Sequence, residues 1–177
     1  YGNQAETVEG RSIPLGADYL DFTIYEPFGV SAQIIPWNYP MEMTARGIAA
    51  ALATGNCCVV KTPELDPISN VFIARAAAAV GLPAGAVNIL CGYGHEAGAA
   101  LAGHPGIGNV VFTGSVETGI KVATAAAQNV RPAILELGGK SAAIIMPDAD
   151  LDVVMDSVRW GIFFNAGRVC SAMSRVI

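Results

Sequence analysis

A cysteine near the carboxyl end of the sequence, Cys170, has the surroundings of a reactive thiol. It follows Gly167 and Arg168 in a loop that comes after a predicted helix. A nearby cation favours the thiolate, which is the nucleophilic form of cysteine. A single cysteine is more often a small buried hydrophobe. That interpretation suits the other three, which lie in or beside predicted strands: Cys57, Cys58 and Cys91.

Two other side chains have the chemistry that such a nucleophile needs. Asn38 stands between two prolines in "IIPWNYP", and a rigid turn of this kind can present an amide N–H to a developing oxyanion. The alternative is a turn in which the asparagine satisfies its own backbone. Glu136 ends an apolar run in "LELGGK", where partial desolvation would suit a general base. The alternative is an ion pair with a cation such as Lys140.

Two strand-to-helix turns carry groups suited to a nucleotide. In "FTGSVETG" the backbone N–H groups between Gly114 and Gly119, with the Ser115 hydroxyl, can hold a pyrophosphate. An ordinary tight turn is the alternative, because a complete G-x-G-x-x-G pattern is missing. In "VVKTPE" the Glu64 carboxylate can accept hydrogen bonds from a ribose diol beyond the end of a strand. The alternative there is a solvated turn with Lys61 and Glu64 exposed.

Strand and helix patterns alternate with short loops, which is typical of a doubly wound parallel sheet in an α/β domain. The predicted strands are 29–36, 57–61, 86–90, 109–114 and 132–137, and the predicted helices are 41–55, 67–81, 94–104 and 115–128. The helix over 67–81 is expected to bury one apolar face, made of Ile68, Phe72, Ala76, Ala79 and Val80.

The flanking segments have patterns of their own. A period-2 strand is predicted over 19–27, with Leu20, Phe22 and Ile24 on one face. Residues 141–146 predict another strand, and 148–164 a helix capped by Asp148 or Asp150. The core face expected of that helix is Leu151, Val154, Met155, Val158 and Ile162.

Composition narrows the class of protein. Hydrophobic residues make up 53% of the 177 residues, which indicates a folded domain with a buried sheet. The net charge of −5, without a Lys/Arg-rich run, argues against nucleic-acid binding. The longest uncharged stretch, 76–94, contains glycines and a proline and predicts no membrane span. The cysteines and the two histidines give no zinc pattern, and reduced thiols favour a cytoplasmic protein.

Together the motifs resemble the aldehyde dehydrogenase superfamily of NAD(P)-dependent enzymes. The motifs "PWNYP", "GN(x)3VK(x)2E", "FTGS(x)3G", "LELGGKS" and "FFNAG(x)2C" occur in that family's order and spacing, from about Gly10 to Ile177. The resemblance implies a Rossmann-like cofactor domain over 27–137. Residues 1–26 would be the end of an N-terminal helix and a bridging β segment used in oligomers. Residues 138–177 would begin a catalytic domain.

The resemblance also implies a role for each candidate. Cys170 corresponds to the nucleophile that forms a thiohemiacetal and then a thioester. Asn38, with the Cys170 backbone N–H, corresponds to the oxyanion donor, and Glu136 to the base that activates water. No metal is implied. The cofactor contacts would be Ile35, Trp37, Lys61, Glu64, Gly114, Ser115, Gly119 and Leu137, and the substrate contacts Tyr39 and Met43.

The expected cofactor is NAD, with NADP as the alternative, because Glu64 would accept from a 2′-hydroxyl and repel a 2′-phosphate. The expected substrate is a small-molecule aldehyde, released as a carboxylic acid because the base is present. A CoA-acylating relative is the poorer alternative. Members of the family are much longer, so we expect a fragment, inactive alone, of a homodimeric or homotetrameric enzyme. A short non-catalytic nucleotide-binding remnant is the other hypothesis.

Two positions depart from the family pattern. Arg168 replaces a usual glutamine, and its charge would assist the thiolate or block the substrate tunnel. Arg46 and Gly47 replace a frequent Trp-Lys pair. An arginine at position 46 is a weak indication of polar or anionic substrates.

Overall fold

The computed structural model describes residues 1–177 and has a five-stranded parallel sheet at its centre. The strand order is β5-β4-β3-β6-β7, with every pair parallel. The sheet strands are β3 (Val30–Ile34), β4 (Cys57–Lys61), β5 (Val87–Leu90), β6 (Asn109–Gly114) and β7 (Ala133–Leu137). The predicted α/β class and the parallel sheet are confirmed.

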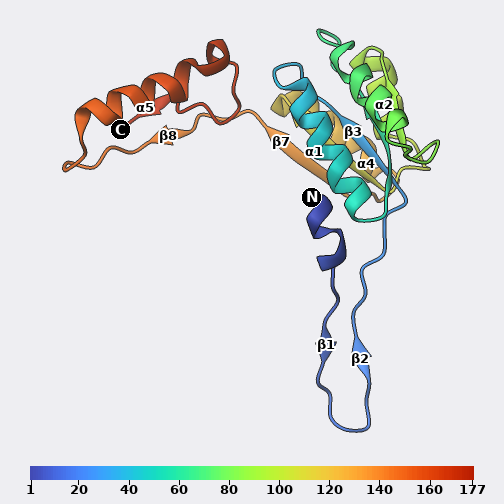
Figure 1. Cartoon of the computed structure of the whole chain (residues 1–177). Coiled ribbons are helices and arrows are strands. Elements are labelled where there is room, and N and C mark those ends of the chain that lie inside the picture. Colours follow the sequence, from blue (N-terminus) through green and yellow to red (C-terminus); the bar gives the residue numbers. More distant parts are fainter.

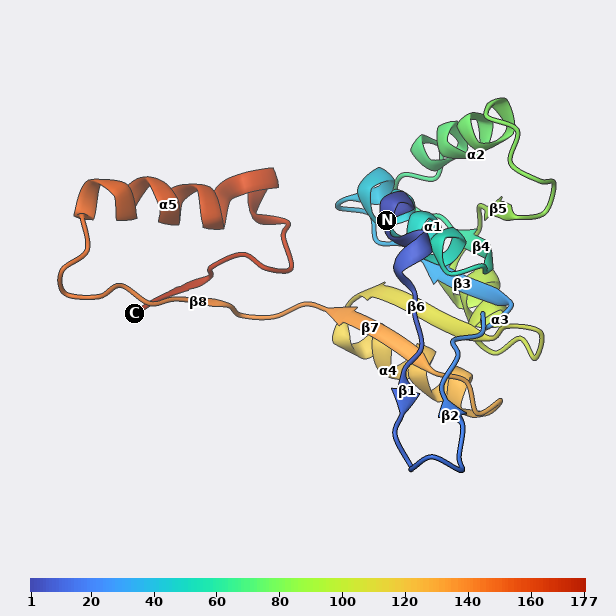
Figure 2. The same cartoon turned by 60° about the horizontal axis from the view of Figure 1, so that its bottom comes forward.

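Helices cover both faces of this sheet (Figure 2). These are α1 (Pro40–Ala53), α2 (Ser69–Ala79), α3 (Ala99–Ala102) and α4 (Val116–Ala127). On one face, α1 packs Ile48 and Ala51 against Cys58 and Val60 of β4. On the other face, α3 and α4 enclose a core of nine buried residues: Ala32, Ile34, Leu101, Ala102, Ile107, Val110, Phe112, Val122 and Ala126.

The predicted helix over 94–104 is split in the structure. A single π-helical turn, η2 (Gly94–Gly98), precedes the short α3. The Glu64 carboxylate accepts a hydrogen bond from the Gly94 backbone N–H, so a side chain from the loop after β4 holds the first turn. Single π-helical turns are frequent at functional sites.

Two segments extend away from the sheet: a hairpin near the N-terminus and the C-terminal part of the chain (Figure 1). At the N-terminal end, η1 (Gly2–Thr7) precedes an antiparallel pair, β1 (Ser12–Ile13) and β2 (Asp21–Phe22). At the C-terminal end, α5 (Leu151–Phe163) and the 3-10 turn η3 (Phe164–Gly167) lie beside the parallel pair β8 (Ala142–Ala143) and β9 (Arg175–Val176). Asp150 caps α5 by accepting from the backbone N–H groups of Asp152 and Val153.

Several sequence expectations are wrong outside the sheet. The strands predicted over 19–27 and 141–146 shrink to two residues each, and Leu20, Phe22 and Ile24 are exposed. The helix α5 buries no residue, because no other layer covers it. In α2 the predicted apolar face is exposed, and the opposite side, with Asn70, packs on α1. No helix is both long and apolar enough to cross a membrane.

The core around β6 generates a stability prediction. Val110 is fully buried, so Val110→Ala should remove two packed methyl groups and lower the free energy of unfolding by about 2 kcal/mol. Val80→Ala is the matched control, because Val80 is 77% exposed. Urea denaturation midpoints measure both variants. Equal midpoints would contradict the assigned core.

Candidate functional site

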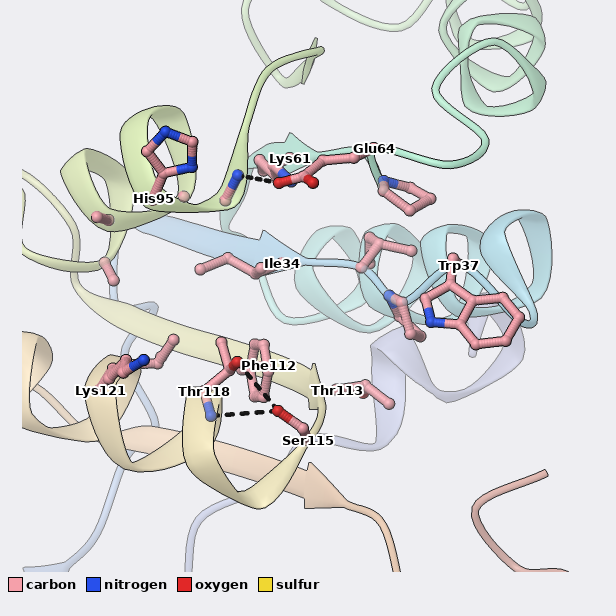
Figure 3. A pocket seen from close by; sticks show the side chains of 18 of the residues that line it. Ile34, Trp37, Lys61, Glu64, His95, Phe112, Thr113, Ser115, Thr118 and Lys121 are labelled. Carbon is pink, nitrogen blue, oxygen red and sulfur yellow. Dashed lines mark hydrogen bonds and ion pairs between the residues drawn. The ribbon is translucent and has the colours of Figure 1, made fainter. Parts of the chain in front are cut away.

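A cavity of about 540 Å³ opens beyond the carboxyl ends of β3, β4 and β6, between η2–α3 and α4 (Figure 3). The chain winds from β3 through β4 to β5 on one side, and then returns to place β6 on the other side of β3. Ligands of open α/β sheets bind in the crevice that such a reversal creates. Ile35, Trp37, Lys61, Glu64 and Ser115 all line the cavity, which brings five predicted cofactor residues together.

Lys61 provides a buried cation in this cavity. It ends β4, is 4% exposed, and its Nζ lies 3.8 Å from Glu64 Oε1. Burial lowers the pKa of Lys61, and the charges of Glu64 and Cys91 oppose that shift. The exposed alternative for Lys61 is therefore wrong. Glu64 is about half exposed, and its carboxylate links Lys61 to the first turn of η2 (Figure 3).

The amino end of α4 faces the same cavity. Ser115 is its N-cap, and the Ser115 hydroxyl accepts from the Thr118 backbone N–H at 3.2 Å. The first N–H groups of a helix have no partners within the helix, and the helix dipole favours an anion there. Gly119 lies one turn further along, is buried, and packs against the Leu137 side chain. Neither Gly119 nor Leu137 lines this cavity, and neither lines the second cavity, which contains Cys170.

A second cavity of about 570 Å³ contains the predicted nucleophile. Cys170 is exposed and lines it with Asn38, Tyr39, Met43 and Gly114. The two cavities share three lining residues, Trp37, Thr113 and Ser115. The thiol and the crevice at the sheet edge are therefore neighbours, although they come from distant parts of the sequence.

Two hydrogen bonds between asparagines and backbone carbonyls hold the Cys170 loop against the turn after β3. Asn38 Nδ2 donates to the Arg168 carbonyl at 2.8 Å, and Asn165 Nδ2 donates to the Asn38 carbonyl at 3.1 Å. The Arg168 guanidinium lies 5.6 Å from the centre of the Trp37 ring, in a cation–π contact. An amide NH2 group has two donors, so Asn38 keeps a second N–H besides the one that holds the loop.

The turn before Cys170 has an unusual backbone. Asn165, Ala166 and Gly167 follow one another with positive φ angles of 49°, 55° and 76°. This left-handed region is natural for glycine and tolerated by asparagine, but costs alanine about 1 kcal/mol or more. Strained backbone of this kind clusters at functional sites. Asn165 was not among the predicted site residues, although it stands within the motif "FFNAG".

Glu136 differs from its expectation. Its side chain is 53% exposed, and Oε1 lies 3.6 Å from Nη2 of Arg46 on α1. The expected desolvation is wrong, because β7 is an edge strand whose residues are alternately exposed. The ion-pair alternative is correct in kind, with Arg46 rather than Lys140 as the cation. Glu136 lines neither cavity.

Nowhere in the chain do three or more His, Cys, Asp or Glu side chains come together in a group that could hold a metal ion.

Comparisons with known proteins identify the family of the chain. The model of the aldehyde dehydrogenase family matches residues 1–177. The chain is 46% identical to human retinal dehydrogenase 2 over 177 residues, and 47% identical to hydroxyisobutyraldehyde dehydrogenase of Mycolicibacterium austroafricanum over 176 residues. Each alignment covers 99% of this chain, but 34% and 35% of the respective relative. The chain thus spans about a third of the length of these curated relatives.

A solved structure supports the same assignment. The NAD+ complex of aldehyde dehydrogenase from Bacillus cereus superposes with a TM-score of 0.92 at 43% identity, over 98% of this chain and 35% of that one. The family match over the whole sequence, the relatives and the shared fold lead to one conclusion. The chain belongs to the aldehyde dehydrogenase family.

Proposed function

We propose that this chain supplies the nucleotide crevice and the nucleophile of an enzyme that oxidises an aldehyde to a carboxylic acid with NAD. The observation that carries the proposal is the shared wall of Trp37, Thr113 and Ser115 between the crevice and the cavity of Cys170. A dinucleotide held in the crevice can extend along this wall toward the thiol. Family membership and the NAD+ complex of the Bacillus cereus relative support the assignment.

The crevice fits a dinucleotide in three respects. The amino end of α4, capped by Ser115, suits a pyrophosphate. The Glu64 carboxylate suits the hydroxyl groups of a ribose, and its charge disfavours a 2′-phosphate. Apolar side chains of β3, β6 and α4, such as Ile34, Phe112 and Val122, form a wall for a flat ring. When bound, the cofactor would accept the hydride that the aldehyde carbon loses.

The residues of this chain account for the remaining chemistry. The Cys170 thiolate attacks the aldehyde carbon, and the free N–H of Asn38 is the donor for the oxyanion that forms. Loss of hydride leaves a thioester on Cys170. Glu136, once released from Arg46, would take a proton from the water that hydrolyses the thioester and restores the thiolate. The relatives give no support for acyl transfer to coenzyme A, and we do not propose it.

The nucleophile can be tested directly. Cys170→Ser should lower aldehyde-dependent NADH formation on the order of 10⁴-fold, because the covalent route is lost. The rate of NADH formation is measured by absorbance, with the complete protein that the gene encodes. Cys57→Ser is the control, since Cys57 is an exposed cysteine that lines neither cavity. Equal rates for wild type and Cys170→Ser would overturn the proposal.

Lys61 should show opposite effects on binding and stability. Lys61→Met keeps the aliphatic stem but removes a buried charge, so NAD affinity should fall about tenfold while the free energy of unfolding rises. The stability gain should be largest near neutral pH and shrink as pH rises through the lowered pKa of Lys61, because wild type then loses the charge too.

The two readouts are a calorimetric titration with NAD and urea denaturation at several pH values. Lys121→Met is the stability control, because Lys121 is 71% exposed on the rim of the same cavity. A loss of stability in Lys61→Met, at unchanged NAD affinity, would show that Lys61 is structural.

A further inference from the structure

The cavity that holds Cys170 is lined by two cations and by no carboxylate. The charged residues among its lining are Lys140, which follows β7, and Arg168, two positions before the nucleophile. The chain as a whole has a net charge of −5. The positive lining is therefore a local property of this cavity, opposite in sign to the protein.

Neither cation is neutralised within the chain. The five ion pairs of the structure involve neither Arg168 nor Lys140. Lys140 Nζ has a backbone acceptor at 3.4 Å, the Gly139 carbonyl. Arg168 donates from Nε to the Asn165 carbonyl at 3.1 Å, which leaves its two terminal nitrogens without an acceptor. Arg46, the other cation considered from the sequence, is paired with Glu136.

Arg168 is also held in position. Its carbonyl accepts from Asn38, its Nε bonds within its own loop, and its guanidinium lies over the Trp37 ring. A guanidinium fixed in this way loses little freedom when it binds a carboxylate, and its fork geometry matches two carboxylate oxygens. The backbone bond to Asn38 does not depend on the side chain at position 168, so this link between the Cys170 loop and the turn after β3 is retained when Arg168 is substituted.

We propose that Arg168, assisted by Lys140, selects aldehydes that carry an anionic group, such as a carboxylate at the far end of the molecule. The aldehyde carbon meets Cys170 while the carboxylate binds the guanidinium. The proposal rests on the function proposed above, and it names the substrate class for the same site. Under this proposal, Arg168 contacts the substrate, and it neither activates the thiolate nor blocks the substrate tunnel.

The test compares two aldehydes with equal numbers of carbon atoms, 5-oxopentanoate and pentanal. Arg168→Gln should raise KM for 5-oxopentanoate about tenfold to a hundredfold, the effect of losing a charge-assisted hydrogen bond. The ratio of kcat/KM for 5-oxopentanoate to kcat/KM for pentanal should fall by the same factor, because the lost loop contacts of the side chain affect both aldehydes alike. Arg168→Lys should recover only part of the affinity for 5-oxopentanoate, because it keeps the charge but loses the fork geometry and the contact with Trp37. Arg131→Gln is the matched control, an exposed arginine that lines neither cavity.

The possible outcomes distinguish a failure of this proposal from a failure of the proposed function. If Arg168→Gln lowered kcat/KM equally for both aldehydes, or lowered kcat alone, Arg168 would act on the loop or the thiolate. The proposal would then be wrong. If wild type oxidised neither aldehyde, the proposed function would fail first. Calorimetry with pentanoate and the neutral pentanamide would then test the anion site without turnover. Wild type should bind pentanoate more tightly than pentanamide, and Arg168→Gln should remove the difference. Equal binding in wild type would reject the site.

Discussion

The reversal of sheet growth between β3 and β6 is the constraint on which the candidate site depends. The two strands are parallel neighbours, but the chain reaches β6 only after it has placed β4 and β5 on the far side of β3. Helices leaving the two strands must therefore cover opposite faces, and a crevice opens between them at the carboxyl edge. The turn after β3 carries Trp37 and Asn38, and the turn after β6 carries Ser115, so both cavities meet at this edge.

Two buried polar side chains of the domain, Gln33 and Lys61, differ in what they do. Gln33 forms a hydrogen bond within the core, where it donates to Ser31 at 2.7 Å. This pairing also limits α1, because a Cβ at Gly47 would lie 2.5 Å from Gln33 Oε1. A lysine at position 47 could not occupy that space without displacing Gln33. Lys61 lies in the crevice instead, where its burial disfavours the charge that the crevice requires. A site that binds anions keeps such a residue at some expense of stability.

The sequence predicted the sheet well, and the side chains around it less well. The predicted bounds of β4 and β6, in the short stretches "CCVVK" and "NVVFTG", agree with the structure. The face of α2 was predicted wrongly because Asn70, a polar residue, is buried through its hydrogen bond with Thr44 of α1. Apolar periodicity cannot show such a pair. Glu136 was expected to be desolvated because it ends an apolar run. Such a run does not reveal that its strand, β7, lies at the edge of the sheet. The Arg46 partner, ninety positions earlier, depends on tertiary structure.

The bond between Asn38 and Arg168 joins residues 130 positions apart in the chain. Closing a segment of this length costs less entropy once the intervening sheet has formed, because the sheet shortens the flexible connection. The crevice needs shorter connections, because β3, β4, β6 and α4 succeed one another within about a hundred residues. We therefore expect the nucleotide crevice and the cavity of Cys170 to form one after the other during folding. The nucleotide crevice forms with the sheet, and the thiol reaches its place last, so the chain passes through states that have a binding site before they have a nucleophile.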